Sequence, residues 1–248
     1  MEVEQPYSVH QFNILPSLND ATDTFMANNG PAIVLSSLWD LFYKHNVTEL
    51  FGPTLIHRHF DLKPNQAIVD VNGTSTPWAL QPQQPEKQGA LRFTKYGGHI
   101  RPCAWIVSSD GNGDGDGQLM PFEFYFEHGD SSRVDTPAKT HASFMREFAS
   151  VVRQHGMAGV IGLRLIRDPE RRSIEVTEGF ANVTFPFTSE AKGLVDRGES
   201  AFLETGWKYP LRAGAEAVAS QRKLITRDIC HWQCVVEDNT HGAKHTDG

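Results

Sequence analysis

Apolar side chains recur along this chain with two different periods, and each period predicts one kind of secondary structure. A spacing of i, i+3, i+4, i+7 is typical of an amphipathic helix, and strict alternation is typical of a strand with one buried face. Pro31 stands where one such helix would begin, at a position that favours proline. The apolar face of this helix comprises Leu35, Leu38, Trp39 and Phe42. Further helices are predicted over about residues 137–155 and, more weakly, about 213–226.

Strict alternation is clearest in the segment Pro121–Glu127. Its apolar face comprises Phe122, Phe124 and Phe126, and its polar face comprises Glu123, Tyr125 and Glu127. Other strands are predicted over residues 55–60, 67–71, 100–107, 160–166, 173–177 and 180–187. Pro102 lacks the N–H group that a ladder needs, so its strand is expected to lie at an edge or to contain a bulge. Residues 168–172 predict a hairpin between the strands on either side.

Short strands with hairpin connections and few helices predict an α+β fold. We expect a mostly antiparallel sheet that could close into a barrel, with two or three helices. The chain has no dinucleotide-binding fingerprint, no phosphate-binding P-loop and no Gly-x-Ser-x-Gly motif, which removes support for several large enzyme classes. Three regions are predicted: an irregular N-terminal segment over 1–30, one α+β domain over 31–228, and a polar tail containing His and Cys over 229–248.

Composition narrows the classes of partner. The 248 residues include 23 Lys and Arg against 30 Asp and Glu, a net charge of −7 that disfavours binding to nucleic acid. The three cysteines are too few, and odd in number, for a disulfide-framed secreted domain. The chain shows no signal-peptide pattern and no apolar run of about 18 residues. We therefore expect a cytoplasmic protein that binds a small molecule and neither nucleic acid nor a membrane, while the oligomeric state stays open.

His57 and His59 are the first candidates for chemistry. In an extended strand, alternate residues point to the same face, so both imidazoles could bind one metal ion. A third ligand must come from elsewhere in the chain, and Glu123 or His99 could supply it. The alternative is that both histidines lie on an exposed strand face.

Three further groups of residues carry weaker signals. Asp110–Gly117 resembles a calcium loop in part, but without the final Glu it is better interpreted as a hairpin turn. The residues Cys230, Cys234, His241 and His245 have the order of a zinc finger, but the linker between the two pairs is too short. The basic cluster Arg164, Arg167, Arg171 and Arg172 could bind a phosphate or carboxylate group, but it is better interpreted as the solvated face of the predicted hairpin.

Several families resemble the segment Leu55–Leu62. Its His-x-His-x-Asp string resembles the metallo-β-lactamase signature, although Leu62 stands where that family has another His. The His-x-His pair also resembles the first motif of cupins, although Lys63-Pro64 stands where those proteins have Glu. Together with Glu175–Pro186, the segment resembles uncharacterised hypothetical proteins of filamentous fungi, which implies an intracellular or biosynthetic role without an assigned activity.

The sequence thus predicts a metal-dependent enzyme, a hydrolase or an oxygenase, that acts on a small molecule in biosynthetic metabolism. His57 and His59 would bind zinc, iron or manganese, and Glu127 or Tyr125 could move protons. A non-catalytic binding or interaction module is an alternative, with Trp78, Trp105 and Phe124 lining an apolar pocket. A metal-free enzyme in which one of the two histidines is the general base is the other.

Overall fold

A computed structural model describes residues 7–80, 91–93, 98–107, 119–128, 137–190, 193, 201–211, 226 and 229–236. The helices are α1 (Val9–Asn13), α2 (Leu18–Ala27), α3 (Gly30–Ile33), the π-helical turn η1 (Val34–Leu38), α4 (Trp39–Lys44), α5 (Pro137–Thr140) and α6 (Ala142–Gln154). The strands are β1 (Phe51–Leu55), β2 (Gln66–Val71), β3 (Thr74–Ala79), β4 (Leu91–Phe93), β5 (Gly98–Val107), β6 (Leu119–His128), β7 (Ile161–Leu165), β8 (Ser173–Glu178), β9 (Ala181–Pro186), β10 (Ala201–Trp207) and β11 (Cys230–Val236).

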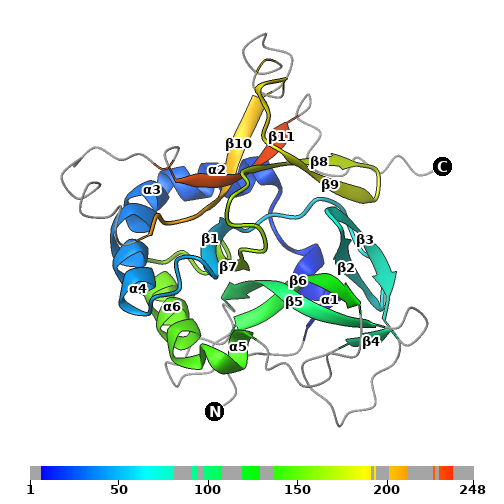
Figure 1. The fold of residues 1–248 in the computed structure, drawn as a ribbon, viewed down its shortest axis with the longest axis horizontal. Helices are drawn as coiled ribbons and strands as arrows, with labels where there is room; N and C mark the ends of the chain where they lie inside the picture. Colours follow the sequence, from blue (N-terminus) through cyan, green and yellow to red (C-terminus); the bar gives the residue numbers. More distant parts are fainter. Residues whose placement is uncertain are drawn as a thin grey trace.

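Ten of these strands close into a barrel, and β4 extends it at β5. The order around the barrel is β5-β6-β2-β3-β9-β8-β11-β10-β1-β7, and pairing of β7 with β5 closes the ring (Figure 1). The pairs β2–β6 and β8–β11 are parallel, and the other pairs are antiparallel. The predicted α+β class with dominant sheet is therefore correct, and the sheet is a mixed barrel.

The two more strongly predicted helices are present, each with an irregularity. The first runs through α3, η1 and α4, and its π-helical turn adds a local widening that the apolar spacing did not predict. The second is divided at His141 into α5 and α6. Leu38, Phe42, Phe144 and Phe148 are fully buried, as their spacing predicts. In Figure 1, α3, α4 and α6 lie together on one side of the barrel.

The prediction that residues 1–30 are irregular is wrong for the described part of that segment. Ser17 caps α2 by accepting a hydrogen bond from the N–H of Asp20. Leu18, Ala21 and Phe25 of this helix are buried in the largest apolar cluster, so the N-terminal segment contributes to the main core.

Three strand predictions also need correction. The strand predicted over 55–60 ends at Leu55, so the segment that follows it is a loop. The hairpin predicted over 168–172 does not form, because β7 pairs with β1 and β5, whereas β8 pairs with β9 and β11. The start of the predicted polar tail instead forms β11, a strand inside the ring. The bulge expected near Pro102 is confirmed by a register shift between Pro102 and Ala104.

The aromatic residues expected around one pocket fall into separate parts of the core. Trp105 lies in the largest cluster, under the helices, whereas Phe124 and Trp78 belong to a different cluster. Within the described residues no helix is long and apolar enough to cross a membrane. The Asp110–Gly117 turn, most of the helix over 213–226, and His241 and His245 lie outside the described residues.

Candidate metal centre

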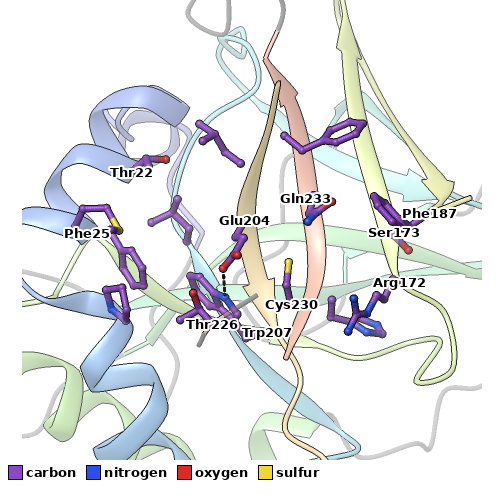
Figure 2. Close-up of a pocket in the computed structure, with 16 residues that line it drawn as sticks. Thr22, Phe25, Arg172, Ser173, Phe187, Glu204, Trp207, Thr226, Cys230 and Gln233 are labelled. Carbon is purple, nitrogen blue, oxygen red and sulfur yellow. Dashed lines mark hydrogen bonds between the residues drawn. The ribbon is translucent and has the colours of Figure 1, made fainter. Parts of the chain in front are cut away.

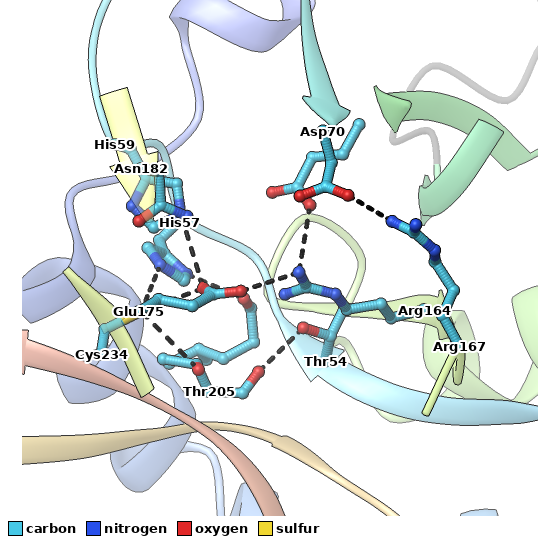
Figure 3. A network of polar contacts seen from close by, with 12 residues as sticks. Thr54, His57, His59, Asp70, Arg164, Arg167, Glu175, Asn182, Thr205 and Cys234 are labelled. Carbon is cyan, nitrogen blue, oxygen red and sulfur yellow. Dashed lines mark hydrogen bonds and ion pairs between the residues drawn. The ribbon is translucent and has the colours of Figure 1, made fainter. Parts of the chain in front are cut away.

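Four buried side chains with metal-binding atoms converge inside the barrel. They belong to His57, His59, Glu175 and Cys234, and one ligand atom from each lies within 4.8 Å of all the others. Figure 3 shows them around the carboxylate of Glu175. Two imidazoles, a carboxylate and a thiol are a donor set that could hold a metal ion of the zinc or iron class.

His57 reaches the centre from the loop after β1. Its ring is 4.7 Å from that of His59, measured between centroids. Nδ1 of His57 lies 3.0 Å from the carbonyl oxygen of Leu55, which can only accept, so Nδ1 carries the proton. Nε2 is then the unprotonated atom, and it lies 3.4 Å from Sγ of Cys234. The two histidines therefore share one site, as predicted, although they do not lie in a strand.

A closed set of hydrogen bonds orients His59. Nδ1 donates to the hydroxyl of Thr177 over 2.8 Å, and that hydroxyl donates to Oδ1 of Asn182 over 3.1 Å. The amide of Asn182 in turn donates to Nε2 of His59 over 3.2 Å. Such second-shell partners fix the tautomer and the ring plane of metal-binding histidines. In this structure the lone pair of Nε2 accepts from Asn182, and Oε2 of Glu175 lies 3.7 Å from the same atom, so a metal ion bound at Nε2 would displace the amide of Asn182.

Glu175 and Cys234 meet because their strands are neighbours. The parallel pairing of β8 with β11 places Cys234 directly opposite Glu175, so both side chains lie on the same face. The thiol donates to Oε2 of Glu175 over 3.3 Å, and it also lies 3.7 Å from the hydroxyl of Thr205 on β10. Burial, followed by the negative charge of Glu175, raises the pKa of the Cys234 thiol well above its ordinary value.

Arg164 of β7 is the cation beside this centre. Its Nη2 lies 2.7 Å from Oε1 of Glu175 and 3.8 Å from Oε2 of Glu123, and its guanidinium group stacks over Trp232, 5.2 Å from the ring centroid. The sequence placed Arg164 on a solvated hairpin, and this interpretation is wrong. The alternation along β7 turns the side chain into the barrel, where it binds two carboxylates.

The two carboxylates respond to burial and to Arg164 in opposite directions. Burial by itself would raise the pKa of Glu175, but Arg164 in the first place, and the two histidines when they are protonated, outweigh it and hold that pKa below the ordinary value. Burial also raises the pKa of Glu123, and there the more distant Arg164 does not compensate, while Glu175 and Asp70 raise it further. Glu175 is therefore ionised, and Glu123 holds a proton more readily.

The topology explains why these groups meet. Six strands that follow one another in the chain, but are spread around the ring, supply interacting side chains: Glu123 from β6, Arg164 from β7, Glu175 from β8, Asn182 from β9, Thr205 from β10 and Cys234 from β11. Side chains from strands spread around a closed ring can meet only in its interior.

The other predicted site residues are not among the four ligands. Glu123 is next to the centre through Arg164. His99 is buried in β5, where it lies opposite Glu127, and Glu127 forms an ion pair with Arg101. Tyr125 carries the guanidinium group of Arg167 over its ring at 4.7 Å.

Sequence reasoning missed Glu175 and did not connect Arg164 or Cys234 with the two histidines. The available signal was in the strand patterns, because Glu175 lies between Ile174 and Val176, and Arg164 between Leu163 and Leu165. A single charge between apolar residues in a short strand indicates a polar side chain that needs a buried partner. Comparisons with protein-family models, with curated proteins and with solved structures found no match to this chain.

Proposed function

We propose that this protein is a metal-dependent enzyme that acts on a small molecule, with the ion bound by His57, His59 and Cys234 beside Glu175. The observation that carries the proposal is the convergence of four ligand atoms within 4.8 Å of one another inside a closed barrel. Burial of four such polar groups costs free energy, because each must be paired away from water. A metal ion would bind His57, His59 and Cys234 together and would lie next to the carboxylate of Glu175.

The donor set favours zinc or ferrous iron over manganese. Thiolate and imidazole are preferred by zinc, whereas manganese prefers carboxylate and water oxygens. A bound ion of this kind supplies Lewis acidity and lowers the pKa of a water molecule at its open position. This supports water activation, and hence a hydrolytic reaction, as the first reaction to test.

Glu175 has a geometry that suits a base as well as a ligand. Its Oε1 is held by Arg164, while Oε2 faces Cys234 and His59. With three ligands from His57, His59 and Cys234, a fourth position stays open and Oε2 can accept a proton from the group bound there. With Glu175 as the fourth ligand, the site is closed and its role is structural.

Metal analysis of purified variants tests this proposal. We expect near-stoichiometric zinc or iron in the wild type and its loss in His57→Ala, His59→Ala and Cys234→Ser, with the fold retained in circular dichroism. Cys230→Ser is the matched control, because Cys230 is buried on the same strand but donates to the carbonyl of Trp232 instead. Wild-type protein that stays metal-free after reconstitution with zinc and with iron would contradict the proposal.

Glu175→Gln separates the two roles of Glu175. If Glu175 is the base of an open site, this variant keeps its metal and loses activity. If Glu175 is the fourth ligand of a closed site, the variant loses metal affinity, and a catalytic role for the ion loses its support.

A pocket on the outside of the barrel supports a second function, binding of a small molecule without catalysis. The pocket has a volume of about 940 Å³ and lies between α2 and the strands β10 and β11 (Figure 2). Phe25 and Trp207 give it an apolar wall, and Glu204 accepts a hydrogen bond from Nε1 of Trp207 over 3.1 Å.

A thermal-shift screen of small aromatic amines, repeated on Glu204→Gln, tests this second function. A ligand that stabilises both proteins equally would contradict a role for this carboxylate.

A further inference from the structure

Two buried carboxylates share one cation at the proposed metal centre. Arg164 contacts both Glu175 and Glu123, and the exposed fractions of the three side chains are 18%, 0% and 14%, respectively. At such burial an ionised carboxylate without a positive partner is costly. One guanidinium group can balance one carboxylate fully, so the second carboxylate has a reason to keep its proton.

The charged groups that face Glu123 from the neighbouring strands decide how easily Glu123 can ionise. Asp70 of β2 and Glu175 of β8 are negative, Cys103 of β5 is a buried thiol, and Arg164 of β7 is positive. Asp70 forms its own ion pair with Arg167, so these two charges offset each other. Within the part of the chain that the structure describes, Arg164 is therefore the cation on which Glu123 depends, and Arg164 is closer to Glu175.

A bound metal ion would change this balance. The ion brings two positive charges, and the thiol of Cys234 loses its proton when it becomes a ligand. The Glu175 side of the network then has one more positive charge than before, so Arg164 is no longer the only cation that balances Glu175. Arg164 can then stabilise the negative charge of the Glu123 carboxylate, so Glu123 can ionise.

We infer that Glu123 is a proton-carrying residue that Arg164 couples to the metal centre, so that it holds a proton without metal and releases it when metal binds. The inference rests on the metal site proposed above. The reaction is balanced: a divalent ion, the Cys234 thiol and the Glu123 carboxylic acid give a metal thiolate, a Glu123 carboxylate and two protons in solution. Metal affinity would therefore rise with pH more steeply than ligand deprotonation alone requires. In the metal-loaded protein, the Glu123 carboxylate is positioned to take up a proton again.

Calorimetric titration with zinc alone tests this inference. Titrations in buffers with different ionisation enthalpies give the number of protons released for each zinc ion bound. At about pH 6, where a carboxyl with a raised pKa is still protonated, we expect Glu123→Gln to release about one proton fewer than the wild type. At about pH 8.5 both proteins should release the same number, because Glu123 is then ionised before zinc is added. Glu178→Gln is the control, since Glu178 lies on the exposed end of β8, and its proton count should equal that of the wild type at both pH values.

The outcomes separate the inference from the proposed function. Equal proton counts for the wild type and Glu123→Gln at about pH 6 would overturn the inference while the metal site stands. Absence of zinc binding by the wild type would contradict the metal site itself, and the inference with it. If Glu123→Gln does not fold, infrared difference spectra of wild-type protein with isotopically labelled glutamate decide the matter. Addition of zinc at about pH 6 should remove a band from a protonated glutamate, and persistence of that band would overturn the inference.

Discussion

Single arginine residues of this chain differ sharply in how strongly the folded structure depends on them. Arg164 joins two carboxylates and an indole ring, whereas Arg171, seven residues later, lies 3.7 Å from Asp168 on the surface. The two arginines belong to the same basic cluster in the sequence. Their surroundings predict very different effects of the same substitution.

We expect Arg164→Met to lower the free energy of unfolding by about 3–5 kcal/mol, because it leaves Glu175 buried without a cation. Arg171→Met should change it by no more than about 0.5 kcal/mol. The pKa of Glu175 is lowered in the folded wild type, so its contribution is present above about pH 4.3 and is lost as the pH falls further. The difference between Arg164→Met and the wild type should therefore shrink in acid. Urea unfolding at several pH values measures these changes, and equal effects of the two substitutions would contradict this account.

His231 gives a second prediction at the scale of single residues. Burial, with smaller contributions from Lys208 and Arg164, lowers its pKa to about 4, while its Nε2 lies 3.1 Å from the carbonyl oxygen of Asp168. Folding thus favours the neutral ring, and the stability that this gives is complete above about pH 6.5 and is lost as the pH falls towards 4. Between pH 7.5 and about 5, the unfolding free energy of the wild type should fall by up to about 2 kcal/mol more than that of His231→Gln, whose amide can still donate to Asp168. Urea unfolding at several pH values measures this difference, and parallel profiles of unfolding free energy against pH for the two proteins would contradict the prediction.

At the scale of elements, closure of the barrel depends on close approach of β7 to β5. Gly162 of β7 lies opposite Thr54 of β1, and an added Cβ atom would come within 2.5 Å of the carbonyl oxygen of Trp105 on β5. It would also overlap the side chain of Ile56. A backbone oxygen cannot move aside without separating the strands.

We therefore expect Gly162→Ala to cost at least about 3 kcal/mol of unfolding free energy, since it opposes the pairing that closes the ring. Gly179→Ala is the comparison, because Gly179 has a positive φ but open space around its Cα atom. That change should cost only about 1 kcal/mol. Urea midpoints of the two variants measure the difference, and a larger loss in Gly179→Ala would show that strand closure is not limiting.

At the scale of the whole molecule, the proposed ion would join segments that are far apart in the chain. His57 follows β1, Glu175 lies on β8 and Cys234 on β11, so one ion would cross-link three parts of the ring. Unfolding must release an ion bound in this way, which couples metal affinity to global stability.

Zinc at 100 times its dissociation constant should add about 2.7 kcal/mol to the unfolding free energy. For a chain of this length, that corresponds to a rise of roughly 5–10 °C in the melting temperature. A chelator should reverse the rise, Cys234→Ser should abolish it, and Cys230→Ser should retain it. Stabilisation of equal size in Cys234→Ser would place the zinc at another site.

Local signals in the sequence determined much of the secondary structure. The apolar spacing from Leu35 to Phe42 and the alternation around Glu123 follow from periods of 3.6 and 2 residues, which any chain must obey to bury one face. Two further features also follow from local signals: Ser17 and Asp20 indicate the start of α2, and Asn72-Gly73 joins β2 to β3 as a tight hairpin turn. The information for each of them lies in a few neighbouring residues.

The sequence alone predicted that His57 and His59 could share one site, and the structure brings them together, although in a loop and not through the strand alternation behind the prediction. Only the tertiary structure decided what completes the site. Cys234 lies 59 residues from Glu175 and 177 from His57, and it reaches them because β11 pairs in parallel with β8 within a closed ring. The period of a strand specifies which side chains share a face, but backbone hydrogen bonds are alike in every strand and do not specify its neighbour. Arg164, Glu175 and Cys234 acquire their common site from that choice of neighbours, which depends on closure of the whole barrel.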